Sequence, residues 1–202
     1  ANKDVRLAIS YAINRQAICD TIFEGSRIPA DGIIPPGIEG YKEGSWAAAK
    51  YDKAAAEQHL EAAGYPGGAG LEITLSVNSG GGHEQIMQLI QADLDAIGVK
   101  AEIQAEEWAA YLTSLSDGNY QIGRLGWVAD YPIMENFLYP LFFSTSGDNR
   151  SQYKNPAVDE ALTEARHTVD TAERIKLMQE ADRLTGEDLP ALPIMFYRHT
   201  YV

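Results

Sequence analysis

The chain of 202 residues is long enough to bury a hydrophobic core, either as one large domain or as two small ones. Its formal net charge of −13 and its pI near 4.6 argue against nucleic acid or an anionic membrane surface as a partner, because both attract basic patches. With one cysteine, Cys19, no internal disulfide can form, and its apolar neighbours predict a small buried side chain.

Apolar residues at helical spacing predict a first helix near the N-terminus, and they are Val5, Ala8, Ile9, Ala12 and Ile13. Asn14 is suited to an N-cap and predicts a second short helix, which ends at Gly25. Residues 26–45 are rich in glycine and proline and predict an ordered loop. Asp52 then predicts the cap of a third helix, which Gly64 ends.

The middle of the chain alternates predicted strands and helices. Strict alternation of apolar and polar residues predicts a strand over residues 71–78, and the helix that follows it stops at Gly98. Residues 99–103 predict a second strand, and an apolar stripe beginning at Trp108 predicts another helix. A third strand is predicted to end at Trp127. This order is typical of an α/β fold with a largely parallel or mixed sheet flanked by helices.

The last third of the chain is predicted to be mainly helical. Asn155 as a cap and Pro156 at the first helical position predict one helix, and Asp170 or Thr171 begins the next. The apolar residues 189–197, which contain prolines, predict an edge or terminal strand. No internal repeat or long linker divides the sequence, so the whole chain is predicted to form one compact α/β unit.

The sequence carries no recognisable metal or cofactor motif. Its histidines show no spacing typical of zinc ligands, and each is predicted to lie at the surface; they are His59, His83, His167 and His199. No serine lies in a nucleophile-elbow motif. We therefore predict no metal site, no cofactor and no catalytic residue. Glu106, Glu107 and Asp130 leave a small carboxylate-dependent hydrolase open as an alternative.

Residues 124–132, with the sequence Arg-Leu-Gly-Trp-Val-Ala-Asp-Tyr-Pro, bring several side chains suited to ligand binding into one short segment. In one interpretation Arg124 binds a carboxylate, Asp130 binds an ammonium group, and Trp127 and Tyr131 pack on the apolar part of a small amphoteric ligand. In the other, Arg124 and Asp130 form an internal salt bridge beneath a core tryptophan. Residue types by themselves leave both interpretations open.

Five segments resemble, in the same order, the extracytoplasmic solute-binding proteins of the oligopeptide and dipeptide ABC-transporter family (family 5 type). They are residues 4–15 (DVRLAISYAINR), 51–65, 94–99, 126–131 (GWVADY) and 153–156. Residues 133–135 (Ile-Met-Glu) depart from the pattern of that family, in which Asp-Pro often follows Tyr-Pro. The resemblance implies a periplasmic-binding-protein-like lobe with a mixed sheet flanked by helices. Residues 1–202 would then form the C-terminal lobe of a two-lobed protein whose first lobe lies outside this sequence.

The resemblance also implies a function. Asp130 would pair with the α-ammonium group of a peptide, Trp127 and Tyr131 would line the pocket, and Arg124 is a candidate partner of the ligand carboxylate. The implied partners are a di- or oligopeptide and an ABC permease in the membrane, with no nucleic acid. The implied location is extracytoplasmic, either in the periplasm or as a membrane-anchored lipoprotein.

Family members also bind nickel complexes, haem, opines and sugars, so a non-peptide solute remains an alternative. An isolated lobe is expected to bind peptide weakly, because half of the cleft would be absent. Some self-association is also expected, because an isolated lobe exposes the surface that would face its partner lobe.

Overall fold

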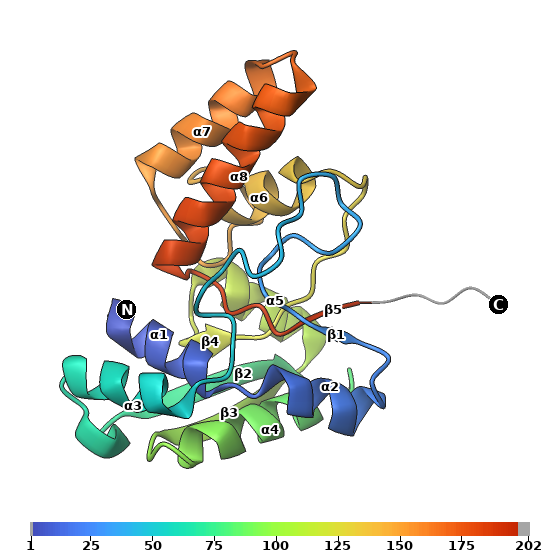
Figure 1. Ribbon diagram of the computed structural model, residues 1–202. Helices are drawn as coiled ribbons and strands as arrows, with labels where there is room; N and C mark the ends of the chain where they lie inside the picture. Colours follow the sequence, from blue (N-terminus) through green and yellow to red (C-terminus); the bar gives the residue numbers. More distant parts are fainter. Residues whose placement is uncertain (1, 198–202) are drawn as a thin grey trace. The chain divides into compact units, whose positions relative to one another are not determined.

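The computed structural model describes residues 2–197, and the contacts within it divide the chain into two compact units (Figure 1). Among the described residues, unit 1 comprises residues 2–29, 50–126 and 194–197, and unit 2 comprises residues 30–49 and 127–193. Each unit is described by itself. A single lobe for the whole chain stays a prediction.

Unit 1 is built on a parallel sheet with the strand order β3-β2-β4. The three strands are β2 (Glu72–Asn78), β3 (Lys100–Glu106) and β4 (Ile122–Gly123). The central strand β2 pairs with β3 along its whole length, and it pairs with β4 at Leu75 and Ser76. The first two predicted strands and the α/β class are therefore confirmed. The polar residues Ser76 and Asn78 at the carboxyl end of β2 are buried as well.

Helices lie on both sides of this sheet. The helical segments of unit 1 are α1 (Lys3–Ala12), α2 (Arg15–Phe23), α3 (Lys53–Ala62), η1 (Pro66–Gly68), α4 (Glu84–Asp95) and α5 (Trp108–Asp117). Figure 1 shows α4 on one side of the sheet and α5 on the other. This is the arrangement expected when the crossover through α4 runs from β2 to β3 and the crossover through α5 runs in the opposite direction, from β3 past β2 to β4. The predicted caps are confirmed, since Asn14 accepts a hydrogen bond from the Ala17 amide and Asp52 accepts one from the Ala55 amide. Cys19 is fully buried, as predicted.

A second, antiparallel pair of strands also belongs to unit 1. The strands are β1 (Ile28–Pro29) and β5 (Met195–Phe196), with Ile28 opposite Phe196. The predicted terminal strand is thus confirmed over two residues. Parallel and antiparallel pairing occur in separate sheets.

The third predicted strand ends earlier than expected. β4 stops at Gly123, and residues 124–129 have no regular secondary structure. The Arg124 amide still donates to the carbonyl of Ser76 at 3.0 Å, but the Arg124 carbonyl accepts from the hydroxyl of Tyr111 at 2.7 Å. A side chain from α5 therefore takes the position of the next ladder bond. The prediction of a strand as far as Trp127 was wrong for this reason.

Unit 2 contains three helices among its described residues, α6 (Glu135–Phe142), α7 (Pro156–His167) and α8 (Thr171–Asp188). The predicted starts of α7 and α8 are confirmed, because Asn155 and Asp170 each accept a hydrogen bond from the first turn. Helix α6 was not predicted from the sequence. It contains Pro140, and its short length gives little periodic signal.

The loop of residues 30–49 is fixed to α8 by a buried tryptophan. Trp46 is 1% exposed, and its indole N–H donates to the carboxylate of Asp182 at 2.8 Å. Burial raises the pKa of Asp182, while hydrogen bonds from Trp46 and Ser45 oppose that rise. One turn further along α8, Gly186 faces the same indole, and a Cβ built there would lie 2.6 Å from Trp46 Cδ1.

We predict that Gly186→Ala lowers the free energy of unfolding, because the added methyl overpacks the site of Trp46 at a cost of about 1–3 kcal/mol. This loss outweighs the gain in helix propensity of about 1 kcal/mol. Gly147→Ala is a matched control in the same unit, since a Cβ there has no neighbour within 4 Å. Its effect on the free energy of unfolding, measured by urea denaturation, is expected to stay within about 0.5 kcal/mol. Equal effects of the two substitutions would contradict the packing argument.

Candidate ligand-binding site

The segment after Gly126 forms a turn whose shape depends on Asn136. The backbone carbonyl of Asn136 accepts the indole N–H of Trp127 at 2.7 Å, and its side-chain oxygen accepts the backbone N–H of Asp130 at 2.9 Å. Asn136 is 5% exposed and lies in the first turn of α6, where Phe137 and Leu138 are also buried. The turn is thus attached to the buried face of a helix.

Asp130 is exposed, and its carboxylate has no ion-pair partner among the described residues of unit 2. Apolar side chains beside it are also exposed: Val128 by 75%, Tyr131 by 47% and Ile133 by 44%. Trp127 is half-buried, and its N–H is already bonded, so it offers a ring face to a ligand. A carboxylate among exposed apolar groups suits a ligand with an ammonium group and an apolar body.

Arg124 lies in unit 1, separate from the other three predicted residues, which lie in unit 2. It follows the carboxyl end of β4, beside the point where the strand order reverses, and such edges are where open α/β sheets bind ligands. Its guanidinium donates to the hydroxyl of Tyr197 at 2.6 Å. Among the described residues of unit 1, no carboxylate neutralises it.

His83 lies next to this arginine. It was predicted to lie at the surface, and it is half-buried there. Burial lowers the pKa of His83, and the positive charge of Arg124 lowers it further. His59 contacts the carboxylate of Asp4 at 2.9 Å, and His167 is exposed. His199 lies outside the described residues.

No group of three or more histidine, cysteine, aspartate or glutamate residues is placed to hold a metal ion within residues 2–197. The glutamates of the hydrolase alternative have structural partners. Glu106 accepts a hydrogen bond from the Ser114 hydroxyl at 2.7 Å, and Glu107 caps α5 through the Ala109 amide.

None of the helices in the described part of the chain has the length and apolar character needed to cross a membrane.

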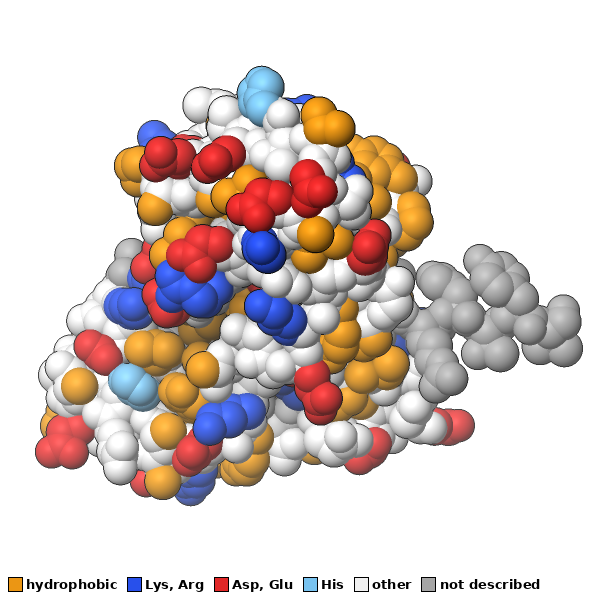
Figure 2. All heavy atoms as spheres, turned by 45° about the horizontal axis from the view of Figure 1, so that its top comes forward, with side chains coloured by type: hydrophobic (Ala, Val, Ile, Leu, Met, Phe, Trp, Pro, Cys, Tyr) orange, Lys and Arg blue, Asp and Glu red, His pale blue; other side chains and the backbone are white. Residues whose placement is uncertain are grey.

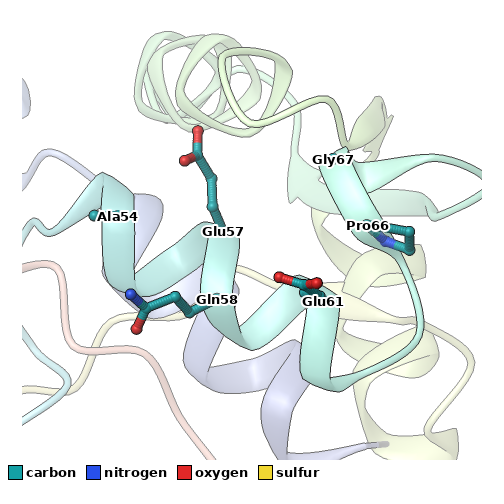
Figure 3. A pocket seen from close by; sticks show the side chains of 6 residues that line it. All are labelled: Ala54, Glu57, Gln58, Glu61, Pro66 and Gly67. Atoms are coloured by element: carbon teal, nitrogen blue, oxygen red, sulfur yellow. The ribbon is translucent and has the colours of Figure 1, made fainter.

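Unit 1 has an open depression of about 440 Å³ between α3 and η1, and none of the residues that line it belongs to the predicted site (Figure 3). Glu57, Gln58 and Glu61 project from α3, and Pro66 and Gly67 form the other wall. Glu57 is within 3.8 Å of Lys53. Glu57 and Glu61 are exposed and belong to the solvated surface. Figure 2 shows acidic and basic side chains interspersed over the face it presents.

The residues that hold the site were not predicted from the sequence. Asn136 was recognised only as part of a matching segment, and Tyr197 only as the end of a strand. The signal available for Asn136 is an amide side chain six positions after Asp130, at the start of an apolar run. Tyr197 is distant from Arg124 in sequence and gives no such signal.

Comparison with known proteins identifies the family. The model of the bacterial extracellular solute-binding proteins, family 5 Middle, matches residues 1–149. The oligopeptide-binding protein OppA of Bacillus subtilis is 31% identical over 208 residues, covering 100% of this chain and 38% of the relative. Heme-binding protein A of Haemophilus influenzae is 31% identical, covering 96% of this chain and 36% of the relative.

A solved structure gives the same result. The periplasmic binding protein DppA of Helicobacter pylori, in complex with the peptide STSA, superposes with a TM-score of 0.86 at 33% identity, covering 96% of this chain and 38% of that one. The chain therefore belongs to the family 5 extracellular solute-binding proteins, which are not enzymes. It spans a little over a third of the length of the relatives it matches.

We predict that Asn136→Ala lowers the free energy of unfolding by about 1–3 kcal/mol, because the part-buried amide of Asp130 loses its acceptor. The amide proton of Asp130 should also exchange faster with solvent. Asn119→Ala, at an exposed side chain, serves as the control and is expected to change stability by less than about 0.5 kcal/mol. Unchanged exchange at Asp130 in Asn136→Ala would contradict the assigned role of the side chain.

Proposed function

We propose that this chain is the C-terminal, ligand-binding lobe of an ABC-importer receptor that captures di- and oligopeptides without chemical change. The observation that carries this proposal is the exposed carboxylate of Asp130, held in a turn by Asn136 and flanked by exposed apolar side chains. Membership of family 5 supports it, since one relative is named an oligopeptide-binding protein and one solved relative holds the peptide STSA.

The α-ammonium group of a peptide is the natural partner of Asp130. A charge-assisted hydrogen bond between ammonium and carboxylate is short and about twice as strong as a neutral one. In an open cleft such a pair contributes about 1 kcal/mol or less, because water screens it. The proposed closure of a second lobe over the ligand excludes water, and the pair then contributes more.

Arg124 is the proposed partner of the ligand carboxylate. Its guanidinium donates to the hydroxyl of Tyr197, and a phenol accepts this hydrogen bond without neutralising the positive charge. Trp127 and Tyr131 would pack on the apolar part of the ligand. Backbone groups common to all peptides would give broad tolerance of side chains.

A non-peptide solute is the alternative, and one relative of equal identity is named a heme-binding protein. Haem carries two propionate groups and no ammonium group. Asp130 would repel these propionates, so its exposed carboxylate favours a ligand with a positive end. The exposed carboxylate gives no comparable argument for or against a sugar, an opine or a metal chelate.

The proposed partners of the complete protein are a peptide and an ABC permease in the membrane. We propose an extracytoplasmic location, in the periplasm or as a lipoprotein anchored to the membrane, consistent with the extracellular family to which the chain belongs. The chain by itself is proposed to bind peptide weakly and to self-associate to some degree.

The test is native mass spectrometry of the complete binding protein, as purified, beside its Asp130→Asn variant. We expect heterogeneous peptide masses on the unmodified protein and their loss in Asp130→Asn, because a neutral amide cannot balance an ammonium charge. Asp148→Asn is a matched control, since Asp148 is an exposed aspartate of unit 2 that lies 3.9 Å from Arg150. It should retain the bound peptides.

Two results would contradict the proposal. A single non-peptide mass would overturn the peptide ligand. Peptides retained equally by Asp130→Asn and Asp148→Asn would overturn the role of Asp130.

A further inference from the structure

A second arginine of unit 1 lies against the tyrosine that orients Arg124. The register of the antiparallel pair places Ile28 opposite Phe196, which brings Arg27 and Tyr197, the next residue on each strand, to the same level. The guanidinium carbon of Arg27 lies 5.4 Å from the centroid of the Tyr197 ring and 5.5 Å from that of Phe23. Both distances are within the range of a cation–π contact. Arg27 therefore lies over the ring of Tyr197.

The hydroxyl of Tyr197 is confined from two further sides. It accepts from Nη2 of Arg124 at 2.6 Å, and a Cβ built on Gly126 would lie 2.9 Å from the same oxygen. The missing side chain of Gly126 leaves room for the hydroxyl, and a tilt of the ring would move this oxygen away from Arg124. The position of the Arg124 guanidinium is thus coupled to the position of the ring.

The partners of Arg124 orient it without cancelling its charge. A neutral phenol accepts a hydrogen bond but leaves the guanidinium positive, whereas a carboxylate partner would neutralise it. Arg27 adds a second positive charge behind the same ring. In a chain with a net charge of −13, this places two guanidinium groups on one tyrosine beside the carboxyl edge of the parallel sheet.

We propose that Arg27 is a positioning residue for anion binding by Arg124, acting through Tyr197, and that the anion is a carboxylate of the captured solute. This inference rests on the proposed function, in which Arg124 meets the carboxylate of a peptide. Arg27 does not touch the ligand. It holds the ring whose hydroxyl holds the guanidinium.

The test compares trialanine with its C-terminal amide by isothermal titration calorimetry on the complete binding protein. In Arg27→Met, which keeps a long apolar stem but loses the charge, the affinity for trialanine should fall about threefold to tenfold. The affinity for the amide should change by less than about twofold, because the amide makes no ion pair with Arg124. Arg27→Lys should recover part of the loss, since an ammonium also forms a cation–π contact.

The Tyr197→Phe variant tests the route of the effect. It removes the acceptor of Arg124, so adding Arg27→Met in this background should weaken trialanine binding by less than about twofold. The proposal would be overturned if Arg27→Met lowered the affinity for trialanine and for its amide equally, while Arg27→Lys was unaffected or equally weakened. Arg27 would then have a general structural role. Unchanged binding of both ligands would overturn it too. Failure of the proposed function is distinct, since the unmodified protein would then bind neither ligand or bind both equally.

Discussion

The two hydrogen bonds to Asn136 are the constraint on which the proposed site depends. Its side chain and its carbonyl hold the Asp130 amide and the Trp127 indole, respectively. Asn136 is itself held in place because α6 buries Phe137 and Leu138 on the same helix. Packing in the core of unit 2 therefore fixes the position of the backbone that carries the exposed carboxylate of Asp130. A loop without this attachment would lose orientational entropy each time it bound a ligand.

Neutral partners orient charged groups at two places in the chain. In unit 2 an amide holds the turn that carries Asp130, and in unit 1 a phenol holds the guanidinium of Arg124. Elsewhere the chain pairs opposite charges directly, as in the contact of Arg183 with Glu180 at 2.7 Å. Such a pair satisfies its own charges and leaves little attraction for a ligand. In the proposed function, this contrast separates the charges of Asp130 and Arg124 from charges that belong to the solvated surface.

Local signals predicted most of the regular elements. Asn14 and Asp52 are caps whose chemistry acts within three residues. The alternation in β2 marks the apolar face of Ile73, Leu75 and Val77, although Ser76 and Asn78 on the other face are buried as well. The end of β4 could not be predicted in the same way, because it depends on the hydroxyl of Tyr111 from another helix. Burial raises the pKa of Tyr111 to about 12, so this hydroxyl keeps its proton and remains a donor at ordinary pH.

The candidate site also combines residues that local signals predicted with residues that only long-range contacts reveal. Arg124, Trp127, Asp130 and Tyr131 were predicted because they lie in one short segment with a family resemblance. The groups that orient them were not, since Tyr197 and Arg27 come from two distant strands and Asn136 from an unpredicted helix. Residue types identify groups able to bind a ligand, whereas long-range pairing decides which of them keep their charge available.

The most direct test of this account is the affinity of the complete binding protein for trialanine and for N-acetyl-trialanine, measured by calorimetry at the same pH and ionic strength. Acetylation removes the positive charge of the amino end and leaves the carboxylate and the peptide backbone unchanged. The account predicts that the acetylated peptide binds at least about tenfold more weakly, equivalent to about 1.4 kcal/mol, because Asp130 loses its partner. Equal affinities would contradict the assignment of Asp130 as the site of the ligand ammonium group.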